Sequence, residues 1–141
     1  MNIKQTSNEQ ELQDAFYVRK QVFVEEQQVP LEEEIDQYED EAVHVVLYDA
    51  QQPVGAGRFR IVDGYGKVER ICVMPSHRKS GAGKIIMMEM EHIARKHGMY
   101  KLKLNAQTHA EGFYQKLGYE TVSGEFLDAG IPHVTMVKIL S

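Results

Sequence analysis

Apolar positions near the start of the chain recur with helical spacing. They fall every three or four residues across positions 9–23, which predicts an amphipathic helix with one buried face. That face comprises Leu12, Ala15, Phe16, Val22 and Phe23. Ser7 or Asn8 can cap the start of the helix. Arg19 lies within the apolar stripe, where a cation either extends to solvent or pairs with a buried carboxylate.

The middle of the chain has the composition of β-strands. Three such runs occupy residues 43–48, 54–62 and 67–73, and residues 2–6 can form a short first strand. The connectors between the three runs are short and rich in Asp, Gly and Pro. We therefore expect hairpins and antiparallel neighbours.

A second amphipathic helix is predicted over residues 81–97, with Gly98 as its C-terminal cap. Its expected inner face comprises Ala82, Ile86, Met90, Ile93, Ala94 and His97. The remaining elements are a strand at 101–105, a short helix at 110–117, and strands near 119–122 and 134–139. This order predicts a mixed α/β (α+β) fold with a central sheet flanked by helices. No repeat or linker divides the chain, so we expect residues 1–141 to form one domain.

Charge is distributed unevenly along the chain. The formal net charge is −5, and residues 25–41 carry nine acidic side chains with no Lys or Arg, which leaves +4 on the rest. Such a run is either a solvated loop or a rim that attracts a cationic substrate. The acidic total argues against nucleic-acid binding, and no apolar run is long enough for a membrane span. A single cysteine, Cys72, excludes an internal disulfide and suits a cytoplasmic protein.

The segment with the clearest chemical meaning is Arg78-x-x-Gly81-x-Gly83, between a strand and a helix. Glycines allow the backbone to close around an anion, and the first amides of a helix point at it with the positive end of the dipole. The segment therefore predicts a phosphate or pyrophosphate site, to which Arg78 and Lys79 can add positive charge. It lacks the Gly-Lys-Ser/Thr ending of a P-loop and the three glycines of a dinucleotide fingerprint.

This segment resembles the acetyl-coenzyme A signature of the GNAT superfamily of N-acetyltransferases. A second block, from Asn105 to Gln107 and then Ala110-x-x-Phe113-Tyr114, is similar to the family's downstream motif at the expected distance. The resemblance spans nearly the whole chain. It implies a mostly antiparallel sheet with a splayed strand pair that holds the cofactor. Two departures are Lys79, where many members have glycine, and His77, where an aromatic residue is common.

The resemblance implies a role for each matching residue. Main-chain groups of Ile71, Cys72 and Val73 would pair with the pantetheine arm of acetyl-coenzyme A. Amides of the turn would hold the pyrophosphate, and the residues concerned are Arg78, Lys79, Ser80, Gly81, Ala82, Gly83 and Lys84. Asn105 and Phe113 would line the cofactor slot, and Tyr114 would lie near the thioester sulfur.

Acyl transfer to an amine by direct attack in a ternary complex requires a proton acceptor, an oxyanion donor and a proton for the departing thiolate. The Val73 amide is the expected oxyanion donor, and Tyr114 is the expected general acid. Glu69 is the first candidate for the base, because strand alternation places it on one face with Ile71 and Val73 and opposite Cys72. Glu69 can equally form an ion pair with Arg58, Arg60 or Arg70.

Other groups could accept the proton or play a structural role. They are Glu26, Asp36, His44, His109 and His133. The histidines show no metal-ligand spacing, so no metal site is expected. Cys72 offers a covalent two-step route, although a buried structural thiol is the commoner case.

Two further functions remain open. The run Arg19-x-x-Val22-Phe23 followed by Asp36 is similar to the start of acyl-homoserine-lactone synthases, which are longer and carry a tryptophan that this chain lacks. A domain that binds acyl-coenzyme A as a sensor, without turnover, is the non-enzymatic alternative. The acceptor is expected to be a small-molecule or peptide amine, bound by loops at residues 30–40 and 124–133. Dimers are common among similar proteins, so a homodimer is a further expectation.

Overall fold

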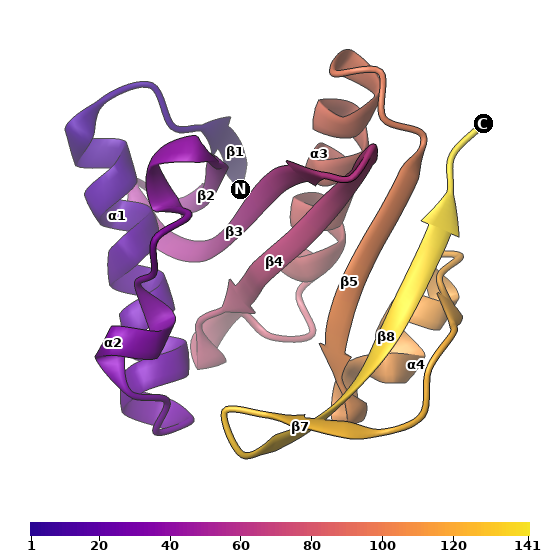
Figure 1. The fold of residues 1–141 in the computed structure, drawn as a ribbon. Helices are drawn as coiled ribbons and strands as arrows, with labels where there is room; N and C mark the ends of the chain where they lie inside the picture. The colour runs from indigo at the N-terminus through magenta and orange to yellow at the C-terminus, as the bar shows by residue number, and fades with distance from the viewer.

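The computed structural model describes residues 1–141 and contains one eight-stranded sheet (Figure 1). Its order is β1-β2-β3-β4-β5-β8-β6, and β7 pairs with β8. The strands span Asn2–Gln5 (β1), Val43–Asp49 (β2), Gln52–Val62 (β3), Tyr65–Val73 (β4), Lys101–Gln107 (β5), Glu120–Thr121 (β6), Phe126–Asp128 (β7) and Ile131–Ile139 (β8). Every pair is antiparallel except β4–β5, which is parallel.

Helices cover both faces of this sheet (Figure 1). The α-helices span Glu9–Arg19 (α1), Leu31–Glu34 (α2), Ala82–Lys96 (α3) and Glu111–Lys116 (α4). A π-helical turn, Lys20–Glu26 (η1), continues α1, and 3-10 turns occupy Glu39–Glu41 (η2), Pro75–His77 (η3) and Thr108–Ala110 (η4). In Figure 1 α3 and α4 lie behind the sheet, and α1 packs on the opposite face of β2, β3 and β4.

The mixed α/β fold predicted from the sequence is confirmed, including the antiparallel strands β2, β3 and β4. Two boundaries differ. The first helix continues three residues beyond its predicted end, because η1 carries it to Glu26. The segment expected to be a loop at residues 124–133 instead contains β7 and its turn to β8. Because β7 is short and mostly exposed, its sequence shows little alternation of apolar and polar residues.

Two hydrophobic cores lie on the two faces of the sheet. The larger lies between the sheet and α3, whose buried positions are Ala82, Ile86, Met87, Met90, Ile93 and Ala94. His97, expected on this inner face, is exposed because it lies at the C-terminal cap. The smaller core packs Ala15, Val18 and Val22 against Val46, Ala56 and Cys72. Val18 was not predicted, whereas Leu12, Phe16 and Phe23 are only half-buried.

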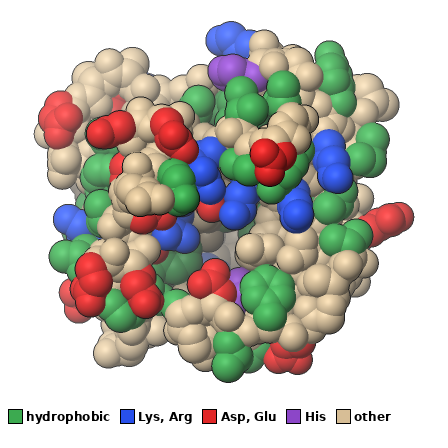
Figure 2. Space-filling model, in the orientation of Figure 1, with side chains coloured by type: hydrophobic (Ala, Val, Ile, Leu, Met, Phe, Trp, Pro, Cys, Tyr) green, Lys and Arg blue, Asp and Glu red, His purple; other side chains and the backbone are tan.

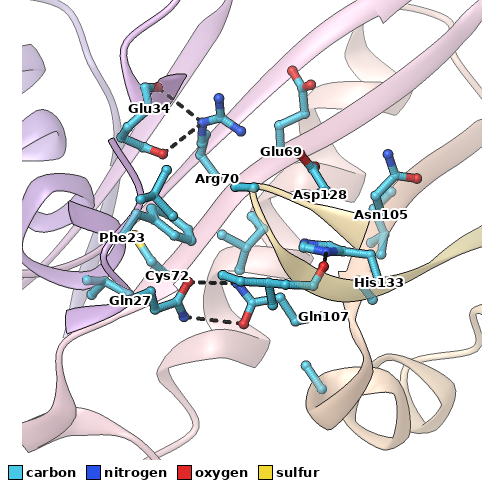
Figure 3. Close-up of a pocket in the computed structure, with 18 of the residues that line it drawn as sticks. Phe23, Gln27, Glu34, Glu69, Arg70, Cys72, Asn105, Gln107, Asp128 and His133 are labelled. Atoms are coloured by element: carbon cyan, nitrogen blue, oxygen red, sulfur yellow. Dashed lines mark hydrogen bonds and ion pairs between the residues drawn. The ribbon is translucent and has the colours of Figure 1, made fainter. Parts of the chain in front are cut away.

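Part of the acidic segment is held against the sheet by arginines, so the expectation of a solvated loop is wrong for that part. Arg19 is fully buried, and its guanidinium donates to Glu34 at 2.8 Å and to Glu39 at 2.7 Å. Arg70 reaches Glu34 at 3.2 Å, as Figure 3 shows. Burial raises the pKa of Glu39, but Arg19 outweighs that effect and lowers the pKa to about 2. The carboxylate therefore stays ionised at neutral pH.

We predict that Arg19→Met lowers the free energy of unfolding by about 3–5 kcal/mol, because it removes the fully buried cation that Glu34 and Glu39 share and leaves each with one arginine, Arg70 or Arg58. Urea unfolding followed by circular dichroism measures the change. Arg95→Met is the matched control. Arg95 is exposed, and its ion pair with Glu91 is long, at 3.7 Å. The control should change the free energy by less than about 0.5 kcal/mol. Equal effects of the two substitutions would contradict this account.

Candidate active site

The candidate site forms where β4 and β5 separate. The two strands pair only from Gly66↔Leu102 to Val68↔Leu104, although β4 continues to Val73 and β5 to Gln107. Beyond Val68 the two strands no longer form hydrogen bonds with each other. The splayed strand pair expected from the family resemblance is therefore present.

A cavity of about 840 Å³ occupies this separation. Both strand edges, η1, α2, α4 and the β7–β8 turn contribute to its lining. Figure 2 shows it as a hollow near the centre of one face, with basic side chains gathered above it and acidic ones to the left and below. Figure 3 shows residues from the two walls, including Arg70 and Cys72 from β4 and Asn105 and Gln107 from β5.

The predicted phosphate turn leads into the start of α3. Gly81, at the N-cap of α3, has φ +87°. No side chain caps the helix, so its first amides remain available to a ligand. Lys79 has φ +64°, a left-handed conformation that explains why glycine is common at this position in similar sequences. His77 bonds to Asp49 at 2.7 Å, and the Ser80 hydroxyl donates to the His77 carbonyl. These contacts hold the turn in place and leave its amides able to bind an anion.

The amide of Val73, the expected oxyanion donor, points into the separation. The next amide, of Met74, bonds to the Val54 carbonyl on β3 at 2.8 Å. Successive amides of a strand point to opposite sides, so the Val73 N–H points away from β3. On that side β5 has already diverged.

Asn105, Gln107, Ala110 and Tyr114 of the second motif line the opposite wall, whereas Phe113, expected there, does not. Phe113 packs on Gly83, where an added Cβ would come within 3.0 Å of the ring, so the two motifs touch. Tyr114 lines the cavity, and burial, followed by the nearby Cys72, raises the pKa of its phenol. The phenol is therefore protonated at neutral pH. Asn105 lines the cavity and accepts a hydrogen bond from Thr135 at 2.9 Å.

The end of η1 makes contacts with both sides of the cavity, which the sequence did not reveal. Arg78 donates to Glu26 at 2.7 Å and to the Val73 carbonyl at 3.0 Å. The Gln27 and Gln107 amides exchange hydrogen bonds of 2.8 and 3.3 Å (Figure 3). Gln27 and Gln107 lie 80 residues apart in the chain, so no local sequence pattern predicts their contact.

The predicted placement of Glu69 on one face with Ile71, and opposite Cys72, is wrong. At Arg70, whose φ is +59°, β4 contains an extra residue opposite Gly57. Such a bulge inverts the alternation of side chains. Glu69 and Cys72 therefore lie on the α1 side of the sheet, whereas Ile71 packs against the core beneath α3.

Glu69 is held in ion pairs. Arg60 lies at 2.7 Å, Arg58 at 2.9 Å and Lys67 at 3.5 Å. Burial raises the pKa of Glu69, but Arg60, Arg58 and Lys67 outweigh it and hold the pKa below its ordinary value. Of the two interpretations of Glu69, the structure favours the ion pair over the proton acceptor.

The other candidate bases differ in their surroundings. Asp36 pairs with Arg58 at 2.8 Å, and Glu26 pairs with Arg78. His44 is buried beside Glu39 and is not among the residues that line the cavity. His109 and His133 both line the cavity without an acidic partner. No group of three or more His, Cys, Asp or Glu side chains is arranged to hold a metal ion.

A sequence model of the family described as Acetyltransferase (GNAT) domain matches residues 3–140. The chain belongs to the GNAT acetyltransferase family. This GNAT protein is 59% identical to YjcF of Bacillus subtilis, named an uncharacterized N-acetyltransferase, over 132 residues that cover 93% of this chain and 94% of YjcF. A second B. subtilis protein, named as an acetyltransferase, is 48% identical across 98% of this chain and 96% of its own length.

Solved structures share the GNAT fold. A Lactobacillus plantarum protein with a provisional N-acetyltransferase name superposes with a TM-score of 0.92 at 26% identity, over 99% of this chain and 98% of its own. An aminoglycoside 6'-N-acetyltransferase complexed with coenzyme A superposes with a TM-score of 0.78 at 18% identity, over 99% and 97% of the two chains. None of the helices in the structure has both the length and the apolar character of a membrane span.

Cys72 lies in the smaller core, 5% exposed, and burial raises the pKa of its thiol. We predict that Cys72 is inert in the folded protein, because only the thiolate reacts readily. Titration with a disulfide reagent should modify it at least about 100-fold more slowly in buffer than in urea. In an acyltransferase assay, Cys72→Ala should therefore match the wild type. Rapid modification of the folded protein, or loss of transfer in this variant, would restore the covalent route.

Proposed function

We propose that this protein transfers the acetyl group of acetyl-coenzyme A to the primary amine of a cationic small molecule or peptide. The transfer takes place by direct attack in a ternary complex. The observation that carries the proposal is the cavity between β4 and β5, which is lined by Val73 and Arg78, where the chain turns toward the start of α3, and by a rim of carboxylates. The single buried thiol agrees with the cytoplasm as the compartment.

The donor would bind along the edge of β4 that β5 leaves free. Pantetheine contains amide groups, which can pair with unpaired strand backbone in the manner of an added strand. The amides from Gly81 to Lys84 suit the pyrophosphate, because they lie at the positive end of the α3 dipole. Arg78 is bound to Glu26, so its guanidinium reaches a phosphate only by exchanging that partner.

The acceptor would bind on the side of α2 and β7. Glu32 and Glu33 from α2 and Asp128 from β7 line the cavity, and none of them forms an ion pair with Lys or Arg. Their potential attracts an ammonium group. Polyamines, aminoglycosides, amino acids and peptide N-termini all present such a group.

Tyr114 would protonate the sulfur as the carbon–sulfur bond breaks. The raised pKa of the phenol keeps its proton available at neutral pH. The Val73 amide would stabilise the developing oxyanion. The engagement of Glu69 in ion pairs is the one observation that favours a sensor instead, because it removes the expected base.

We predict that Gly81→Glu abolishes acetyl-coenzyme A binding, since it places a carboxylate at the pyrophosphate position. Titration calorimetry should show an affinity loss of at least about 100-fold. Gly98→Glu is the matched control, because Gly98 has φ +71°, open space around it and a place at the far end of α3. Both variants carry similar backbone strain. Equal losses would assign the effect to folding, and a wild type without binding would contradict the proposal.

We predict that Tyr114→Phe lowers kcat about 100-fold or more and leaves the Kd for acetyl-coenzyme A within about threefold. Release of free thiol is measured with spermidine, kanamycin and trialanine as acceptors. Tyr100→Phe is the control, because Tyr100 is about half exposed and lies outside the cavity lining. A wild type that binds acetyl-coenzyme A but acetylates none of these amines would favour the sensor.

A further inference from the structure

His133 is a buried imidazole on the acceptor side of the cavity. It is 8% exposed, lines the cavity and lies opposite Gln107 in the β5–β8 ladder. The Phe126 ring stacks on it, with ring centroids 6.0 Å apart and planes at 23°. This packing fixes the orientation of the ring, which Figure 3 shows beside Gln107 and Asn105.

One hydrogen bond sets the tautomer of His133. Its Nδ1 lies 2.6 Å from the Ile131 carbonyl oxygen. A carbonyl oxygen only accepts hydrogen bonds, so Nδ1 carries the proton. In the neutral ring Nε2 then keeps a free lone pair, and no ion pair or second hydrogen bond engages it.

The other ionisable groups of the cavity are paired or exposed. Four carboxylates are each bound to at least one arginine, namely Glu26, Glu34, Asp36 and Glu69. The remaining acidic side chains, Glu32, Glu33 and Asp128, are exposed. His109 is also exposed, and its Nε2 bonds to Gln107 at 2.7 Å. His133 alone combines burial, a fixed tautomer and an unengaged basic atom.

The two faces of the sheet place His133 opposite the expected acid. Val134 and Met136 pack in the core beneath α3, so alternation turns His133 to the other face. Tyr114 belongs to the core beneath α3 and reaches the cavity from that side. The two side chains therefore line one cavity from opposite faces, through the separation of β4 and β5.

We infer that His133 is the general base of the proposed acetyl transfer, with Nε2 accepting the proton of the attacking amine. This inference rests on the proposed function. Nε2 takes a proton from the bound ammonium, which frees the nitrogen lone pair. The lone pair forms the N–C bond, the C–S bond breaks, and the sulfur takes the Tyr114 proton. The phenolate then takes the second proton from the nitrogen, and the imidazolium releases its proton to solvent. The products are an N-acetylated amine and free coenzyme A thiol.

The ionisable groups that line the cavity together with His133 come from several elements. Asp128 lies on β7, Glu69 and Arg70 on β4, and Glu32 and Glu33 on α2, while His109 lies on η4. Arg70 is held by Glu34 and Asp36.

The test is His133→Asn, whose side-chain amide can still donate to Ile131 but cannot accept a proton at neutral pH. With spermidine, kanamycin and trialanine as probes, we expect kcat to fall about 100- to 10,000-fold. The acid limb of the kcat–pH profile should disappear. The Kd for acetyl-coenzyme A should stay within about threefold. His92→Gln, on an exposed position of α3, should leave kcat unchanged.

Two measurements keep the inference testable if His133→Asn fails to fold. Imidazole added to His133→Ala should restore part of the lost kcat, which a structural role would not allow. Nitrogen-15 spectra of the wild type should show the proton of neutral His133 on Nδ1. A proton on Nε2, or retention of the acid limb in His133→Asn, would overturn the inference.

The outcome also separates this inference from the proposed function. If wild type acetylates an amine and His133→Asn does so equally well, the base assignment fails and the transferase stands. Loss of the acid limb in His109→Gln alone would assign the base to the other histidine. If wild type binds acetyl-coenzyme A and never turns over, the proposed function fails, and the base assignment fails with it.

Discussion

The separation of β4 from β5 is the constraint on which the site depends. Parallel strands that part after Val68 leave backbone amides and carbonyls facing a cavity instead of each other. Unpaired backbone groups cost free energy when buried, so such an edge is stable only when it faces water or a ligand with amide groups of its own. The same separation lets side chains from both faces of the sheet reach one cavity. Both the proposed donor site and the proposed approach of the acceptor depend on this single break in the ladder.

The arginines of β3, β4 and α1 determine which carboxylates are available to substrate. Arg19, Arg58 and Arg70 bind the inner members of the acidic segment, and Arg58 and Arg60 bind Glu69. What remains at the surface is a set of outer carboxylates around the cavity. The acidic segment therefore has two roles: its inner side chains attach it to the protein, and its outer ones give the rim its charge. A count of charges along the sequence could not separate these roles.

Much of the fold could be predicted because its signals are local. The turn from Arg78 to Gly83, the amphipathic pattern of α3 and the hairpins between β2, β3 and β4 each depend on neighbouring residues. The errors arose where the backbone departs from regular strand geometry. The bulge at Arg70 inverted a strand face without a neighbouring glycine or proline in β4 to mark it. The tautomer of His133 depends on the Ile131 carbonyl two residues before it, a contact that strand alternation does not predict.

The link between Gln27 and Gln107 joins the N-terminal helical layer to the end of β5. Each neutral hydrogen bond contributes about 0.5–1.5 kcal/mol net, so two of them together hold the walls with only about 1–3 kcal/mol. At that free energy, roughly one molecule in six to one in two hundred has the link open at any moment. The link therefore opens through thermal motion alone. A ligand that needs the wider opening can select molecules already open, and its association rate then falls in proportion to their fraction.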